Sequence, residues 1–193
     1  ANVPYRIKSY KELVKDPRET IDFDAHLNKE IDTLVKEKGA DGRLLRHGSG
    51  EVCYANMAEK ILVTSLVKLS NFIPEAGIWL NTQRPEWSDA NNALVGNGTS
   101  MVTLYYLRRF LDFWNRFFEQ LKLENVPVAE EVAGFLHSVL FTLKQHSGNL
   151  KTGFSPRQRE QFASEMGTAG SDYRETIYAG SFSGKKENIP LNS

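Results

Sequence analysis

Apolar residues recur along most of the chain at the three- and four-residue spacing that gives an α-helix one apolar face. No stretch alternates polar with β-branched apolar residues over the length of a strand, so a substantial sheet is not expected. The pattern therefore predicts an all-α fold of antiparallel helical hairpins. Together with the glycine and proline positions, it places helices over residues 9–15, 23–38, 56–72, 100–122, 127–148 and 155–167.

The segment over residues 100–122 carries only a narrow polar stripe. Aromatic and aliphatic side chains, among them Trp114 and Phe117, fill most of its remaining circumference. A helix that is apolar on nearly every side has to be covered by neighbouring elements. We therefore expect this helix to be central and the most buried of the set.

Residues with special backbone roles predict where several helices begin and end. Asn56 begins a sequence that resembles a capping box, and either Thr99 or Ser100 can cap the helix over residues 100–122. Pro127 suits the first position of a helix because proline has no N–H to leave unpaired. Gly167 and Gly170 predict the end of the last helix. The sequence thus predicts a helical domain and an extended C-terminal tail, over residues 1–180 and 181–193.

The charge balance and the few metal-ligating residues argue against several classes of partner. Lysine plus arginine and aspartate plus glutamate each number 24, so the formal net charge is zero and no field would steer a nucleic acid. The apolar stretches contain charges every few residues, whereas a membrane helix needs about 20 apolar residues, so we expect a soluble protein without a membrane segment. Four scattered histidines and a single cysteine show no metal-ligand spacing, so neither a metal nor another cofactor is expected.

Cys53 and His47 are reactive residue types near a glycine-rich segment, residues 39–50, that is expected to be an irregular loop. No residue that would lower the pKa of the Cys53 thiol is evident nearby in the sequence. We therefore interpret Cys53 as a small buried apolar residue rather than a nucleophile. A solvated histidine and a ligand-contacting histidine are both compatible with the position of His47.

Residues 81–98 are dense in functional groups that a fold does not need. The indole of Trp87 offers a flat apolar face to a sugar ring, and its neighbours offer the donors and acceptors that hydroxyl groups require. Glu86 and Asp89 can divide acid and charge-stabilising roles in glycoside cleavage if burial separates their pKa values. In the alternative interpretation, Asp89 and the asparagines only hydrogen-bond the loop's own backbone and cap the next helix. The candidate substrate-binding neighbours are Arg84, Asn91 and Asn92.

The motif Glu-Trp-Ser-Asp-Ala-Asn-Asn, beginning at Glu86, is followed by Val-Gly-Asn-Gly-Thr-Ser, ending at Ser100. Together they resemble the Asp-Trp-Asn-Asp-Gly-x-Asn, Val-Gly and Gly-x-Gly-Glu-Ser stretch of the cellobiose and chitobiose phosphorylases, which belong to the inverting enzymes with a six-hairpin α/α barrel. The resemblance implies that Asp89 is the general acid that protonates the leaving glycosidic oxygen. Other residues fall on family positions and are expected to serve the substrate site, namely Trp87, Asn92, Gly96, Gly98 and Ser100.

The length of the chain limits what the resemblance implies about the fold. A barrel of twelve helices needs at least about 200 residues, and the pattern supplies about five to seven helices. We therefore expect part of an α/α barrel, resembling the general-acid half of an inverting glycosidase or glycoside phosphorylase. Its expected partners are an oligosaccharide or glycoside ligand and the remainder of a larger polypeptide.

An inverting enzyme also needs a second carboxylate on the opposite face of the sugar. Glu51, Glu75 and Glu165 are candidates only through their positions near loops. As a glycoside hydrolase-like or phosphorylase-like enzyme, the chain is therefore expected to be incomplete by itself. The alternative function is a non-catalytic helical module that binds sugar or another protein.

Overall fold

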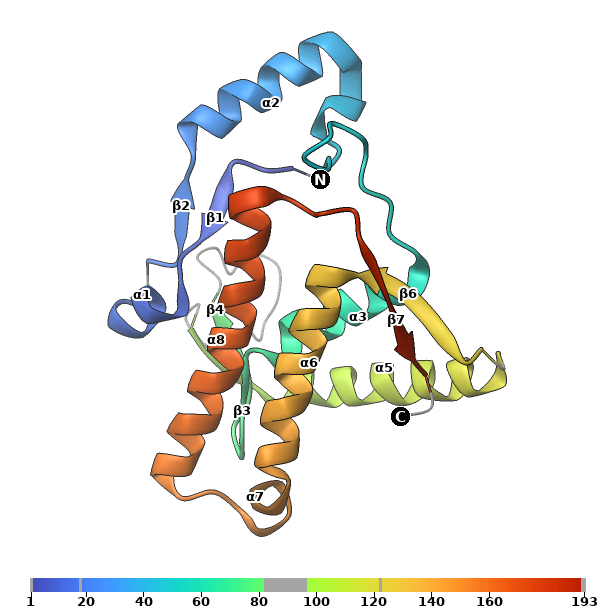
Figure 1. Ribbon diagram of the computed structural model, residues 1–193. Coiled ribbons are helices and arrows are strands. Elements are labelled where there is room, and N and C mark those ends of the chain that lie inside the picture. Colours follow the sequence, from blue (N-terminus) through green and yellow to red (C-terminus); the bar gives the residue numbers. More distant parts are fainter. Residues whose placement is uncertain (1, 18, 82–96, 122, 192–193) are drawn as a thin grey trace.

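The computed structural model describes residues 2–17, 19–81, 97–121 and 123–191 (Figure 1). Its helices are Tyr10–Lys15 (α1), Ala25–Lys38 (α2), the 3-10 helix Gly39–Arg43 (η1), Met57–Leu69 (α3), Met101–Gln120 (α5), Glu130–Gln145 (α6), Ser147–Thr152 (α7) and Pro156–Gly180 (α8). Its strands are Tyr5–Ile7 (β1), Ile21–Phe23 (β2), Phe72–Ile73 (β3), Gly77–Asn81 (β4), Asn97–Ser100 (β5), Asn125–Ala129 (β6) and Lys186–Pro190 (β7). The fold is mostly helical but not strictly all-α. Within these ranges, no helix is both long and apolar enough to cross a lipid bilayer.

The hydrophobic core lies between α3, α6 and α8. Figure 1 shows α6 and α8 side by side. Side chains of both helices form one buried cluster with Leu66 of α3. Fully burying a large apolar side chain contributes about 1.5–3 kcal/mol to folding. The buried centre of the core consists of Leu66, Phe135, Val139, Phe162, Met166 and Ala169.

The expectation that α5 is the central helix is wrong. Leu107 is its one buried residue, while Tyr106 and Phe113 are 64% and 59% exposed. Figure 1 shows α5 running crosswise to α6 and α8 and extending away from that pair. A narrow polar stripe shows how much apolar surface a helix carries, but it does not show which part of the described chain covers that surface.

Two of the local signals for helix starts are confirmed. The side chain of Asn56 accepts the N–H of Glu59 at 2.8 Å, as the capping-box-like sequence predicts, and Ser100 accepts the N–H of Thr103 at 3.1 Å. Pro127 was assigned wrongly, because it lies inside β6 and α6 begins only at Glu130. The stiffness of proline suits the edge of a two-stranded sheet as well as the start of a helix.

Gly167 and Gly170 do not end α8, which continues to Gly180. Their role is close packing: a Cβ built on Gly167 would lie 2.2 Å from Cε2 of Tyr10, and one on Gly170 would lie 2.7 Å from Oγ of Ser70. Glycine therefore lets α1 and the end of α3 approach α8 closely, although it weakens an isolated helix. The sequence alone could not distinguish this use of glycine from a helix end.

Short antiparallel strands join segments that the sequence pattern left as loops or a tail. β3, β4 and β5 form one sheet, while β1 pairs with β2 and β6 pairs with β7. Part of the predicted extended tail forms β7, in which Ile189 pairs with Val126 of β6. These strands are two to five residues long, which is too short for a clear polar and apolar alternation.

Candidate functional site

The motif from Glu86 to Ser100, called here the sugar-enzyme-like motif, follows β4 in the sequence and ends in β5. These two strands pair as a hairpin. Asn81 pairs with Asn97, Leu80 with Gly98 and Ile78 with Ser100. Gly77 permits this closeness, because a Cβ there would lie 2.8 Å from the carbonyl oxygen of Ser100 and its φ is +122°. The hairpin thus fixes both points from which the motif extends.

The structure describes only two of the substrate-site residues that the sequence predicts. Gly98 lies in β5, and Ser100 is buried and caps α5, so both have a clear structural task. The catalytic candidates Glu86 and Asp89 lie outside the described residues. The same holds for the predicted substrate-binding residues Arg84, Trp87, Asn91 and Asn92, and for Gly96.

A cavity of about 460 Å³ lies directly beside this hairpin. We call it the hairpin pocket; it is lined from α1, β2, the end of α3, β4 and α8. Trp79 and Leu80 of β4 contribute one wall, and Tyr10 and Gly167 contribute another. Both volume and lining match a small-ligand site, in which apolar and aromatic walls carry a few polar groups. The polar groups include Ser70 and Asn71, which follow the last turn of α3.

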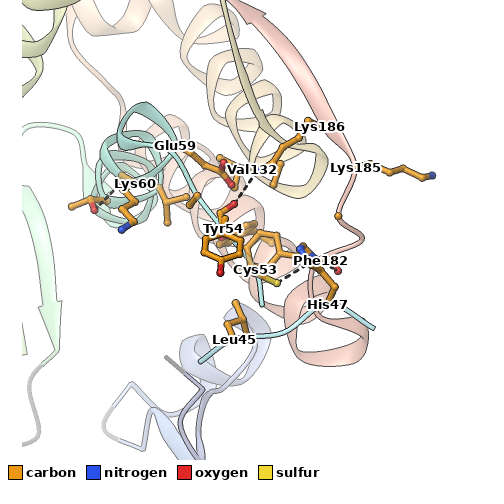
Figure 2. Close-up of a pocket in the computed structure, with 16 residues that line it drawn as sticks. Leu45, His47, Cys53, Tyr54, Glu59, Lys60, Val132, Phe182, Lys185 and Lys186 are labelled. Atoms are coloured by element: carbon orange, nitrogen blue, oxygen red, sulfur yellow. Dashed lines mark hydrogen bonds and ion pairs between the residues drawn. The ribbon is translucent and has the colours of Figure 1, made fainter. Parts of the chain in front are cut away.

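A second cavity, of about 480 Å³, lies where the C-terminal segment crosses α3 and α6. We call it the C-terminal pocket, and Figure 2 shows its labelled residues. Lys186 donates to Oε2 of Glu59 at 2.7 Å, and the Glu59 side chain is 5% exposed. Lys185 points away from this pair (Figure 2). The buried carboxylate of Glu59 is therefore already paired with Lys186.

Cys53 and His47 meet in the C-terminal pocket, but their geometry does not activate the thiol. Nδ1 of His47 lies 3.2 Å from Sγ of Cys53 and 3.1 Å from the carbonyl oxygen of Phe182. A carbonyl oxygen can only accept, so Nδ1 carries the proton and cannot take one from the thiol. Burial, and then the charge of Glu131, raises the pKa of Cys53. Cys53 is half-buried rather than fully buried as expected, and the thiol stays neutral.

His47 instead holds the C-terminal segment against the segment before α3. Its ring bonds the carbonyl oxygen of Phe182, and nearby the hydroxyl of Ser181 donates to the carbonyl oxygen of Arg46. Histidine at this position therefore has a structural explanation. The predicted irregular loop is wrong in part, since it contains η1 and a bridge between Arg46 and Val52.

The candidates for the second carboxylate are occupied or remote. Glu75 pairs with Arg159 and accepts the N–H of Phe154 at 3.1 Å, and the bond from Arg159 holds the pKa of Glu75 below its usual value. Glu165 bonds Nε2 of His146 at 3.0 Å. Glu51 is exposed in the turn beside Val52. None of the three lines the hairpin pocket.

Within the described parts of the chain, no group of three or more histidine, cysteine, aspartate or glutamate side chains could hold a metal ion. Sequence reasoning also missed the hairpin pocket itself. Trp79, an aromatic residue a few positions before the motif, was the sequence feature that could have indicated a ligand site there. Arg174 lines the pocket from α8, and no sequence pattern connects it with Trp79.

Comparison with models of known protein families finds no match for this chain, and comparison with curated proteins finds none either.

Proposed function

We propose that this chain is a carbohydrate-binding domain that holds a sugar ring in the hairpin pocket against the indole of Trp79. One observation carries the proposal: Trp79 and Leu80 line a ligand-sized cavity on the same strand that leads into the sugar-enzyme-like motif. The proposed binding site and the motif are therefore neighbours in the sequence.

The chemistry of the pocket supports a sugar over a wholly apolar ligand. A sugar ring presents C–H groups on one face and hydroxyl groups around its edge, so it fits a site that combines an aromatic wall with polar groups. Trp79 and Tyr10 supply aromatic surface, and the side-chain amide of Asn71 is exposed at the rim. The amide of Asn71 donates to the carbonyl oxygen of Val67, which leaves its side-chain oxygen to accept from a hydroxyl group.

The finer proposal follows the resemblance of the motif. In it, the domain is part of a six-hairpin α/α barrel and the general-acid half of an inverting glycosidase or glycoside phosphorylase. Asp89 then protonates the leaving oxygen, and Glu86 takes the charge-stabilising role. Because Glu75 and Glu165 are held by Arg159 and His146, the described residues offer no free second carboxylate at the pocket. We therefore expect sugar binding with little turnover.

A binding measurement with matched variants tests the proposal. Neutral cello- and chito-oligosaccharides are titrated calorimetrically into the wild-type chain, into Trp79→Ala and into Tyr54→Ala. Tyr54 is 81% exposed and lines the C-terminal pocket, so it controls for the loss of an aromatic ring elsewhere. Loss of a stacked indole should weaken binding about tenfold or more, while Tyr54→Ala binds like wild type. Equal binding by Trp79→Ala and wild type, at matched melting temperatures, would exclude this pocket as the site.

The alternative function is the non-catalytic module. A turnover assay separates it from the enzyme: any glycoside cleavage by the wild-type chain should disappear in Asp89→Asn, because the amide keeps the shape but has no proton to give. Binding without cleavage in both proteins favours the sugar-binding module. If no glycan binds, the exposed aromatic side chains of α5 favour the protein-interaction function instead.

A further inference from the structure

One face of α8 meets two other elements, α1 and the end of α3. Gly167 packs against the ring of Tyr10, Gly170 packs against Ser70, and the hydroxyl of Ser171 accepts the N–H of Tyr10 at 3.0 Å. Arg174 follows one turn later on the same face and lines the hairpin pocket. The close approach that the two glycines permit therefore helps to place Arg174 in the lining of the same cavity as Trp79.

Arg174 makes no hydrogen bond and no ion pair with the described residues, although the charges of Tyr178 and Glu175 favour its charged form. Its Nε is buried without an acceptor, and no ion pair reaches its guanidinium group. Two other arginines are engaged: Arg6 stacks over the ring of Tyr178 at 4.4 Å, and Arg159 pairs with Glu75. The adjacent acid Glu175 accepts a hydrogen bond from Ser171. Arg174 is half-buried and its Nε is buried without an acceptor, so an anion that entered the cavity would gain a charge-assisted hydrogen bond there.

The lining of the hairpin pocket has one sign of charge. Arg174 and Lys68 are its charged residues, and neither aspartate nor glutamate is among the described residues that line it. Desolvation by burial lowers the pKa of Arg174, which is the electrostatic cost that a bound anion would offset. The remaining lining is mostly aromatic and apolar.

We propose that the ligand of the hairpin pocket is an acidic glycan whose carboxylate pairs with Arg174 while its ring lies against Trp79. This inference rests on the proposed function and names the substrate class for the same site. A uronic acid provides both features in one residue, a pyranose ring and a carboxylate. The planar guanidinium group matches a carboxylate with two parallel N–H···O bonds, which neutral sugars cannot form. Lys68 adds a second positive charge to the cavity.

Ligand pairs that differ only in charge test the proposal. Oligogalacturonate and oligoglucuronate are each compared with their methyl esters, which keep the ring but lose the carboxylate. The proteins are wild type, Arg174→Gln, Trp79→Ala and Arg157→Gln, the last being an exposed arginine on the same helix outside the pocket. Affinity is measured by calorimetry and fold integrity by melting temperature. A merely structural arginine would reveal itself as a lower melting temperature in Arg174→Gln.

We expect at least one acid to bind about 10- to 100-fold more tightly than its ester, the range that a charge-assisted bidentate pair supports. Arg174→Gln should erase this preference without lowering the melting temperature, and Arg157→Gln should keep it. Equal binding of acid and ester, both weakened by Trp79→Ala, would overturn the acidic-glycan inference and leave the proposed function standing. If neither acid nor ester binds, the inference fails, and the titration with neutral oligosaccharides then decides the proposed function independently.

Discussion

Lys186 of β7 donates to the buried carboxylate of Glu59 on α3 at 2.7 Å, so the C-terminal strand is tied to the core by a charge pair. Lys186→Met leaves Glu59 buried without its cation. Breaking a fully buried pair costs about 3–5 kcal/mol, and we expect about 1–2 kcal/mol because the Lys186 side chain is 38% exposed. Chemical denaturation measures the change in the free energy of unfolding.

Lys185→Met is the control for this prediction, because Lys185 is 76% exposed and lies 3.9 Å from Glu130. It should change the free energy of unfolding by less than about 0.5 kcal/mol. The double variant Glu59→Met with Lys186→Met should recover part of the loss, since it buries no charge. A Lys186→Met protein as stable as Lys185→Met would show that the pair does not hold the strand.

Glu131 makes the same region sensitive to acid. Burial alone would raise the pKa of Glu131, but the hydrogen bonds from Ser183, together with the backbone N–H of Glu131 and the charge of His47, lower the pKa below the usual value of 4.5. The N–H of Ser183 donates to Oε1 at 2.6 Å. A carboxylate whose pKa is lower in the folded than in the unfolded chain stabilises the fold fully above 4.5, and this contribution disappears as the pH falls through the folded value.

Melting temperatures of wild type and Glu131→Gln, followed from neutral pH downward through 4.5, measure this effect. Wild type should be the more stable protein at neutral pH, and the difference should shrink as the pH falls. A difference that stays constant over the range would mean that the Glu131 charge does not contribute to holding the C-terminal segment.

Two glycines should respond to alanine with opposite signs. Gly134 lies within α6, and a Cβ there meets nothing within 4 Å, so Gly134→Ala should stabilise the protein by about 1 kcal/mol. A Cβ on Gly42 would lie 2.4 Å from the carbonyl carbon of Leu34, so Gly42→Ala should cost about 1–3 kcal/mol. Thermal unfolding reports the first change, and hydrogen exchange in α2 and η1 reports the second. If both substitutions raised the free energy of unfolding, or both lowered it, this account of their packing would be contradicted.

The features that the sequence predicted correctly are local ones. Capping by Asn56 and Ser100 depends on residues three positions away, so their patterns are readable along the chain. The burial of α5 and the roles of Pro127 and Gly167 depend on elements far away in sequence. For these residues the same local pattern fits two structures, and only the tertiary partners decide between them.

The candidate site divides in the same way. The motif around Asp89 is contiguous and could be recognised, although the structure does not describe it. Trp79 lies on β4 and Arg174 lies on α8. They line one cavity only because the fold gathers β4, α8, α1 and the end of α3 around it. No spacing rule links two such residues, so the cavity and its positive charge could be found only from the folded structure.

The tryptophan indole N–H signals test the central claim most directly, since the chain has three tryptophans in three different places. Trp79 lies in the hairpin pocket, Trp114 lies beside a separate groove between α3 and α5, and Trp87 belongs to the motif. Each signal is assigned by substitution with phenylalanine, and a binding glycan is titrated while NMR spectra are recorded. Saturation should shift the Trp79 signal and leave the Trp114 signal in place. A Trp79 signal that stays fixed at saturation would contradict the account.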